Sequence, residues 1–109
     1  MFLARVTGNV VATQKDKSLG GQTLFVVEPL NVKYNEQTKE PASLGNTGRA
    51  IVALDSVGAG EGQLVLVVQG SSARMTEQTK DLPADAVIVG IVDSAEFAGM
   101  QFYSAQGND

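Results

Sequence analysis

A glycine-rich turn between two apolar runs constrains the fold of this chain more than any other feature. Ala50–Leu54 and Leu64–Val68 are almost continuously apolar, and Gly58, Gly60 and Gly62 fall in the short segment between them. Glycine adopts backbone angles that other residues avoid and lets chain segments approach closely. We therefore expect a turn in a crowded position, such as a symmetry axis or a phosphate site.

Five segments have the pattern of β-strands. The first alternates between apolar or small residues and polar ones, which is the period of a strand with one buried face, and Gly8 inside it predicts a bulge. The runs beside the glycine turn are short and β-branched, which favours strands buried on both faces over helices. The expected strands are Phe2–Ala12, Thr23–Val27, Arg49–Asp55, Gln63–Gln69 and Ala86–Asp93.

The segments between these strands predict connections. Pro29 is expected to limit further pairing of the second strand, and Val32–Gly48 reads as a long hairpin loop on the surface. Ser71–Glu77 predicts a helical turn that a serine caps. Five strands with one short helix predict an all-β fold, a five-stranded OB-like β-barrel.

We expect a single domain, with the barrel over residues 1–93 and a C-terminal extension over residues 94–109. The extension contains a cluster of large apolar side chains. These side chains are expected either to seal the chain's own barrel or to lie on a neighbour; the aromatic ones are Phe97, Phe102 and Tyr103.

Composition excludes several classes of function. The chain has 109 residues, a net charge of −4 and neither Cys nor His. The acidic balance opposes nucleic-acid binding, and the missing residue types exclude thiolate chemistry, haem ligation and the usual zinc sites. No acidic run has the spacing of a calcium loop, so no metal or cofactor is expected.

The location of the protein follows from similar observations. The absence of cysteine fits a reducing cytosol, and no apolar stretch approaches the roughly 18 residues of a membrane span. The N-terminus lacks the pattern of a signal peptide. We therefore expect a cytosolic protein with no membrane partner.

Three segments together resemble the EutN/CcmL family, the vertex proteins of bacterial microcompartment shells. The resemblance implies a barrel that assembles as a homopentamer, caps the vertices of a carboxysome or metabolosome shell in the bacterial cytoplasm, and meets hexameric shell proteins. It does not extend to the loop Lys33–Gly48 or to the tail after Asp93. The matching segments are Gly8–Lys15 with Leu19–Gly21, Ala53–Gly60 with Val65–Leu66 and Gly70–Arg74, and Asp85–Asp93.

Two surfaces are candidates for the contacts of such a ring. The turn expected to line the five-fold axis or a pore consists of Ser56, Val57, Gly58, Ala59, Gly60 and Glu61. The candidates for the subunit interface are Gly70, Ser71, Ser72, Arg74, Asp93 and Phe97. Arg74 could pair with a carboxylate across the interface, for which Asp93 is one candidate. Three lysines are expected either on a solvated face or at the edges of hexameric tiles; they are Lys15, Lys17 and Lys80.

Other interpretations of the same residues remain open. The glycine turn could be a plain hairpin turn or a phosphate cradle, although its spacing is not GxGxxG. Asp55 could pair with Glu61 in acid–base catalysis, but an Asp that accepts hydrogen bonds from turn amides is the favoured interpretation because no nucleophile accompanies it.

Two rival functions follow from the barrel itself. One is an OB-like module that binds single-stranded nucleic acid or another ligand, which would need a basic groove and stacking aromatic residues. Aromatic residues make up 6% of the chain and Trp is absent, so this rival is disfavoured. The second is an enzyme, which the absence of any catalytic pairing opposes. We expect a structural protein with no catalytic residues.

Overall fold

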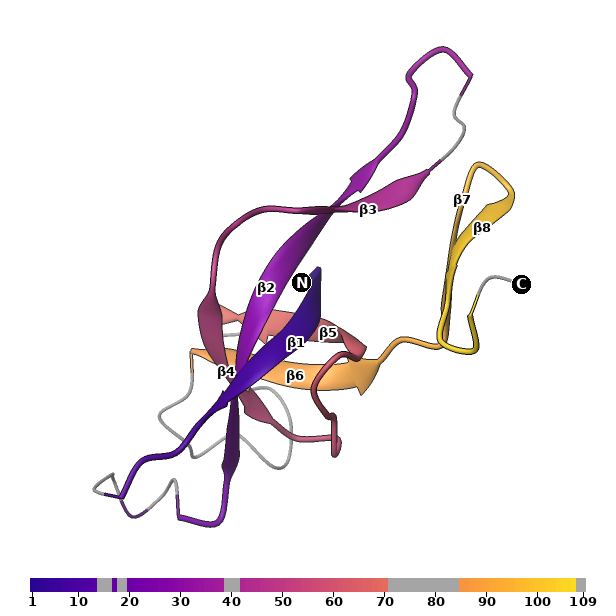
Figure 1. Ribbon diagram of the computed structural model, residues 1–109. Helices are drawn as coiled ribbons and strands as arrows, with labels where there is room; N and C mark the ends of the chain where they lie inside the picture. Colours follow the sequence, from indigo (N-terminus) through magenta and orange to yellow (C-terminus); the bar gives the residue numbers. More distant parts are fainter. Residues whose placement is uncertain (14–16, 18–19, 39–41, 71–84, 108–109) are drawn as a thin grey trace.

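The computed structural model describes residues 1–13, 17, 20–38, 42–70 and 85–107, which form β-strands joined by turns (Figure 1). Within these residues the strands are β1 Phe2–Val10, β2 Thr23–Lys33, β3 Ser43–Asn46, β4 Ile51–Asp55, β5 Leu64–Gln69, β6 Ala86–Ile91, β7 Ser94–Phe97 and β8 Met100–Ser104. The predicted helical turn Ser71–Glu77 lies outside the described residues. Among those residues, no helix has the length and apolar character needed to cross a membrane.

Five of the strands close into a barrel. The sheet runs in the order β1-β5-β6-β4-β2, and β1 pairs again with β2 to complete the circle. All neighbours in the barrel are antiparallel except β4 and β6, which pair in parallel at Leu54–Val87 and Asp55–Ile88. The predicted five-stranded OB-like barrel is confirmed, and its members correspond to the five expected strands.

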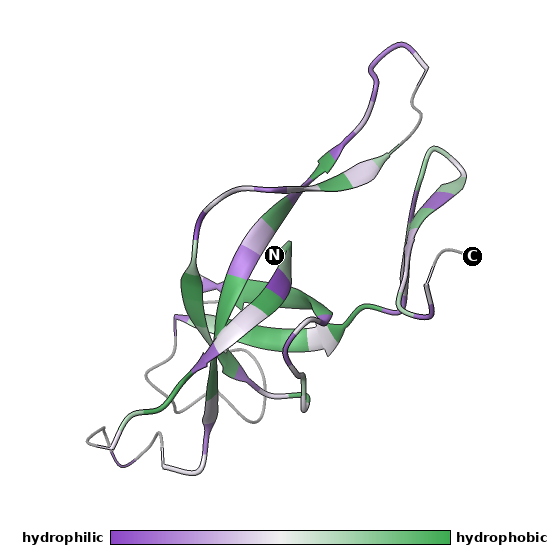
Figure 2. Ribbon diagram, viewed as in Figure 1, coloured by the Kyte–Doolittle hydropathy of each residue, from purple (hydrophilic) through white to green (hydrophobic). Residues whose placement is uncertain are grey.

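Strand alternation places one apolar face inside the barrel and a second one outside it. β5 and β6 are mostly green, and so apolar, in Figure 2, because consecutive residues of both strands are buried, on the inner and on the outer face of the barrel. Outside the barrel, Leu54 and Val87 are buried against Leu24, Val68 and Val89. The interior core consists of Ala4, Val6, Phe25, Val27, Ala53, Val65, Val67, Ala86 and Ile88.

The expected bulge at Gly8 is confirmed, because the register of β1 against β2 shifts between Val6 and Gly8. Such a shift increases the local twist that a closed barrel needs. The outer strand ends differ from expectation. The first strand ends at Val10 and the last barrel strand at Ile91, each before the expected boundary.

The long loop after the second strand contains more structure than expected. β2 continues past Pro29 to Lys33 and pairs with β3, so that residues 30–38 and 42–46 form a projecting hairpin, called here the arm (Figure 1). Pro29 did not stop the strand: on one edge of β2 it pairs with Ala4 of β1, and on the other edge it lies between the ladders to β4 and β3. Pairing with β4 ends at Val27, pairing with β3 begins at Leu30, and the Pro29 carbonyl accepts a hydrogen bond of 2.6 Å from Thr47 Oγ1.

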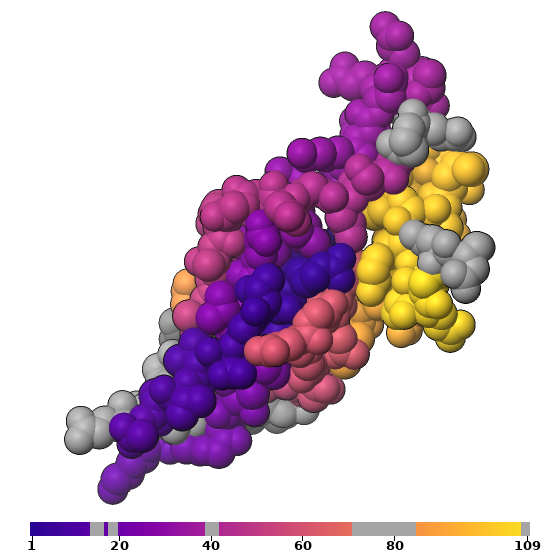
Figure 3. Space-filling view, viewed as in Figure 1, coloured from indigo at the N-terminus to yellow at the C-terminus, as the bar shows by residue number. Residues whose placement is uncertain are grey.

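The tail forms a second hairpin that the sequence analysis did not anticipate. β7 and β8 pair across Ala98 and Gly99, whose φ angles of 55° and 80° are the left-handed values of a tight hairpin turn. In the space-filling view, this C-terminal hairpin (residues 94–104, yellow) lies against β1, β5 and the arm (Figure 3).

Candidate functional site

The glycine turn between β4 and β5 is held by two separate sets of hydrogen bonds. Its first half is bound to the carboxylate of Asp55, the last residue of β4. Oδ1 accepts the amide of Val57 at 3.1 Å, Oδ2 accepts that of Gly58 at 3.1 Å, and Ala59 N lies 3.0 Å from Oδ2. We call Val57–Ala59 the Asp55-bound half. The favoured prediction for Asp55, that it accepts bonds from turn amides, agrees with this geometry.

The second half of the turn, Glu61–Gln63, is bound to β1, and we call it the β1-bound half. The amide of Gly62 donates to the carbonyl of Val6 at 2.8 Å, and the amide of Val6 donates to the carbonyl of Gln63 at 3.0 Å. The side chain of Arg5 adds a bond of 3.0 Å from Nη1 to the Gly62 carbonyl. These bonds continue the β1–β5 pairing beyond the end of the regular ladder.

Polar side chains complete the turn and fix it to the barrel. Asn9 Nδ2 donates to Glu61 Oε1 at 3.3 Å, and Gln63 Oε1 accepts the amide of Gly60 at 2.8 Å. Ser56 Oγ donates to the carbonyl of Ile88 in β6 at 2.7 Å. The Asp55 carboxylate accepts from turn amides, whereas the Glu61 carboxylate accepts from Asn9 of β1, so the geometry does not join the two as an acid–base pair.

The glycines of the turn play different roles. Gly58 and Gly62 have φ angles of 80° and 87°, in the left-handed region that side chains other than glycine rarely adopt. Gly60 lacks a positive φ, and a Cβ there would meet only Gln63 Oε1 at 3.9 Å. In the single chain, the left-handed backbone angle is therefore required at Gly58 and Gly62 and not at Gly60.

The turn also presents apolar surface. Val57 is 40% exposed and Gly58 is exposed, whereas Ala59 packs against the interior core. A single exposed valine is ordinary on a protein surface and does not by itself mark a contact. Within the described residues, no group of three or more Asp or Glu side chains could hold a metal ion.

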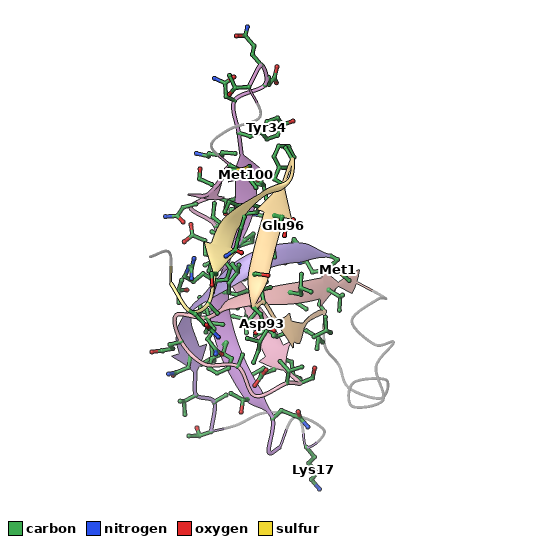
Figure 4. The ribbon with its side chains drawn as sticks, turned by 90° about the vertical axis from the view of Figure 1, so that its right-hand side faces the viewer. Met1, Lys17, Tyr34, Asp93, Glu96 and Met100 are labelled. Atoms are coloured by element: carbon green, nitrogen blue, oxygen red, sulfur yellow. The ribbon has the colours of Figure 1, made fainter. Side chains whose placement is uncertain are left out.

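Three of the six candidate interface residues, Gly70, Asp93 and Phe97, lie in the part of the chain that the structure describes. Gly70, with a φ of 65°, donates its amide to the carbonyl of Asp85 at 2.8 Å. Asp93 is exposed and lies at the junction of the barrel and the C-terminal hairpin (Figure 4). Ser71, Ser72 and Arg74 lie outside the described residues, so the pairing of Arg74 with Asp93 stays a prediction.

Phe97 contacts the arm of its own chain. Its ring centroid lies 4.4 Å from that of Tyr34, with 34° between the ring planes. Figure 4 shows Tyr34 beside the tip of the C-terminal hairpin, close to Met100. Tyr34 is 41% exposed and Met100 is 50% exposed, so apolar surface remains around this contact. Sequence analysis did not single out Tyr34, because nothing in the loop predicted a strand that would place it there.

A hollow lies at the end of the barrel where β1 ends and β2 begins. It has a volume of about 440 Å³ and is bounded by Asn9–Ala12 and Gln22–Phe25. Its walls carry no charged side chain and no aromatic residue except Phe25. This surface lacks the basic groove and the stacking residues that single-stranded nucleic acid requires.

Comparisons with known proteins agree on one family. A family model described as ethanolamine utilisation protein EutN/carboxysome matches residues 1–93. The bacterial microcompartment shell vertex protein EutN of Salmonella typhimurium is 37% identical over 99 residues, covering 91% of this chain and 90% of that protein.

Two solved structures share the fold. CcmL of Gloeobacter violaceus superposes with a TM-score of 0.82 at 30% identity, covering 98% of this chain and all of the other. The pentameric microcompartment shell protein GrpN of Rhodospirillum rubrum gives a TM-score of 0.68 at 40% identity, covering 89% of this chain and all of that protein. The family match spans the whole barrel, including the glycine turn. The chain belongs to the EutN/CcmL family.

Proposed function

We propose that this protein is a structural component of a bacterial microcompartment shell, where it forms homopentamers that cap the vertices. The observation that carries the proposal is the likeness to pentameric GrpN over that protein's whole length. The relatives named as shell vertex proteins support the same role. The protein accordingly resides in the shell, within the bacterial cytoplasm.

Geometry gives the reason for such a part. A flat layer of hexagonal tiles cannot close on itself, and pentagons at its corners provide the curvature that closes it. A ring of five identical chains uses a heterologous interface, in which one patch of each subunit meets a different patch of the next. The elongated subunit, with extents of 51 × 25 × 23 Å, offers widely separated surfaces for two such patches.

The turn Ser56–Glu61 is proposed to line the five-fold axis. Its support is the combination of small residues, the exposed Val57 and a backbone fixed from both ends by Asp55 and β1. Five copies of one turn meet closely at an axis, and small side chains on a rigid backbone suit that crowding. The interface is proposed to use Gly70, Ser71, Ser72, Arg74, Asp93 and Phe97, and hexameric shell proteins are proposed as the outer partners.

A catalytic role is not part of this proposal. Asp55 uses its carboxylate to hold the turn, Glu61 is bound by Asn9, and the chain contains neither Cys nor His. The relatives are shell vertex proteins, which act by assembly. The binding-module alternative has less support, because the chain is acidic and poor in aromatic residues.

Shell closure in cells tests the function directly. Shell proteins of the same compartment are produced with and without this chain, and the particles are imaged by electron cryo-microscopy. We expect closed polyhedral particles only when the chain is present, and open or elongated ones without it. Closed particles of the same shape in its absence would contradict the vertex role.

A further inference from the structure

We propose that Arg5 couples the C-terminal hairpin to the glycine turn, so that a docked hairpin holds the β1-bound half of the turn in place. The consequence for assembly rests on the proposed function, because it takes this turn to lie at the five-fold axis. The coupling itself is made within one chain, so it can be measured independently of ring formation.

Arg5 contacts both elements with one guanidinium group. Its neighbours Ala4 and Val6 are buried in the barrel, so strand alternation directs Arg5 outward. Nη1 donates to the carbonyl of Gly62 at 3.0 Å, and Cζ lies 5.9 Å from the centre of the Tyr103 ring in β8. A planar guanidinium can stack on an aromatic ring while it donates hydrogen bonds at its edge.

Gly62 depends on these bonds more than an ordinary residue would. It has no side chain to pack, and its φ of 87° lies in the left-handed region. Its amide is bound to Val6 and its carbonyl to Arg5, so β1 holds both sides of this residue. When Arg5 loses the ring that supports it, the guanidinium samples other positions and the Gly62 carbonyl is bound for less of the time.

The coupling gives the C-terminal hairpin a role beyond covering the barrel. Its other end is docked on the arm through Phe97 and Tyr34, at the far side of the hairpin from Tyr103. A change in the hairpin's position, by truncation or by a neighbouring subunit, would therefore reach the turn through Arg5. Arg5 acts here as a positioning residue for the proposed axial element.

Amide hydrogen exchange measures the coupling. In Tyr103→Leu, we expect the amides of Gly62 and Gln63 to exchange about two- to fivefold faster than in the wild type, the range given by an exposed cation–π contact. Tyr103→Phe keeps the ring and should restore the wild-type rates. The amides of Gly58 and Ala59 are an internal control, because they are bound by Asp55 and should not change.

A second variant separates coupling from loss of stability. Arg5→Gln should accelerate exchange at Gly62 at least as much, because it removes the donor itself, and combining it with Tyr103→Leu should add nothing further. Unchanged exchange in Tyr103→Leu, or equal acceleration in both halves of the turn, would overturn the coupling. The native mass of each variant is recorded in parallel. Absence of rings even in the wild type would contradict the proposed function, whereas unchanged exchange within intact rings would contradict only the role of Arg5.

Discussion

Removal of the Asp55 carboxylate tests how the glycine turn is held. Asp55→Ala leaves the amides of Val57, Gly58 and Ala59 without their acceptor, at donor–acceptor distances of 3.0 to 3.1 Å in the wild type. Side chains that accept from free amides at helix starts contribute about 0.5–2 kcal/mol, and bonds to charged groups contribute about 1.5–3 kcal/mol. Water can replace part of this at an exposed turn, so we expect a loss of about 1–2 kcal/mol in the free energy of unfolding.

The assay is urea denaturation followed by circular dichroism at one fixed protein concentration, because oligomer stability depends on concentration. Asp55→Asn keeps one acceptor oxygen without the charge and should lose about half as much. Glu61→Gln is the matched control, since its one hydrogen bond in the described structure is a 3.3 Å contact from Asn9. We expect it to stay within about 0.5 kcal/mol of the wild type. Equal stability of Asp55→Ala and Glu61→Gln would refute the account of the turn.

Three further predictions concern the turn, the hairpin and the interface. Gly62→Val forces a side chain into a left-handed backbone and should destabilise the fold by at least about 1–2 kcal/mol, whereas Gly60→Val should leave the barrel stable. Circular dichroism and native mass spectrometry together then test the axis: a folded Gly60→Val that still forms the wild-type oligomer would contradict axial placement of the turn. Phe97→Ala removes the ring contact with Tyr34, and such aromatic pairs contribute about 0.5–1.5 kcal/mol. The variant should be cleaved faster by a protease in the C-terminal hairpin but not in β5. Equal cleavage of the wild type and the variant would refute the docking contact. Arg74→Ala should weaken subunit association, measured by dilution in light scattering, more than it lowers unfolding stability; loss of folding alone would contradict the interface assignment.

The barrel was predictable because local patterns and tertiary packing agree in it. The alternation in β1 follows its single buried face, and the continuous apolar run of β5 follows burial on both faces, where Leu64 and Val65 are each fully buried. Gly8 marked the bulge that curves the first strand. The position of Asp55 just before a glycine-rich segment predicted that its carboxylate accepts hydrogen bonds from the turn, since this short side chain reaches the amides that follow it.

The strand pairing within the arm and the C-terminal hairpin were not predictable for a different reason. Proline disrupts strand pairing only where a partner strand needs the amide that proline lacks. At Pro29 this depends on where the ladder to β4 ends, which is set by the packing of the whole barrel and not by the local sequence. The hairpin turns at Ala98 and Gly99, although alanine rarely takes a φ of 55° and so gives no turn signal. The two contacts of Arg5 could not be expected from the sequence around it, because they come from segments far along the chain.

The native mass of the purified chain tests the central claim most directly. Native mass spectrometry, checked by light scattering on a sizing column, is run on the wild-type protein across a range of concentration and salt. The vertex account predicts a single species of about 57 kDa, five copies of the 11.4 kDa chain. A monomer or dimer that persists on concentration would contradict the pentameric ring and leave only the barrel fold established.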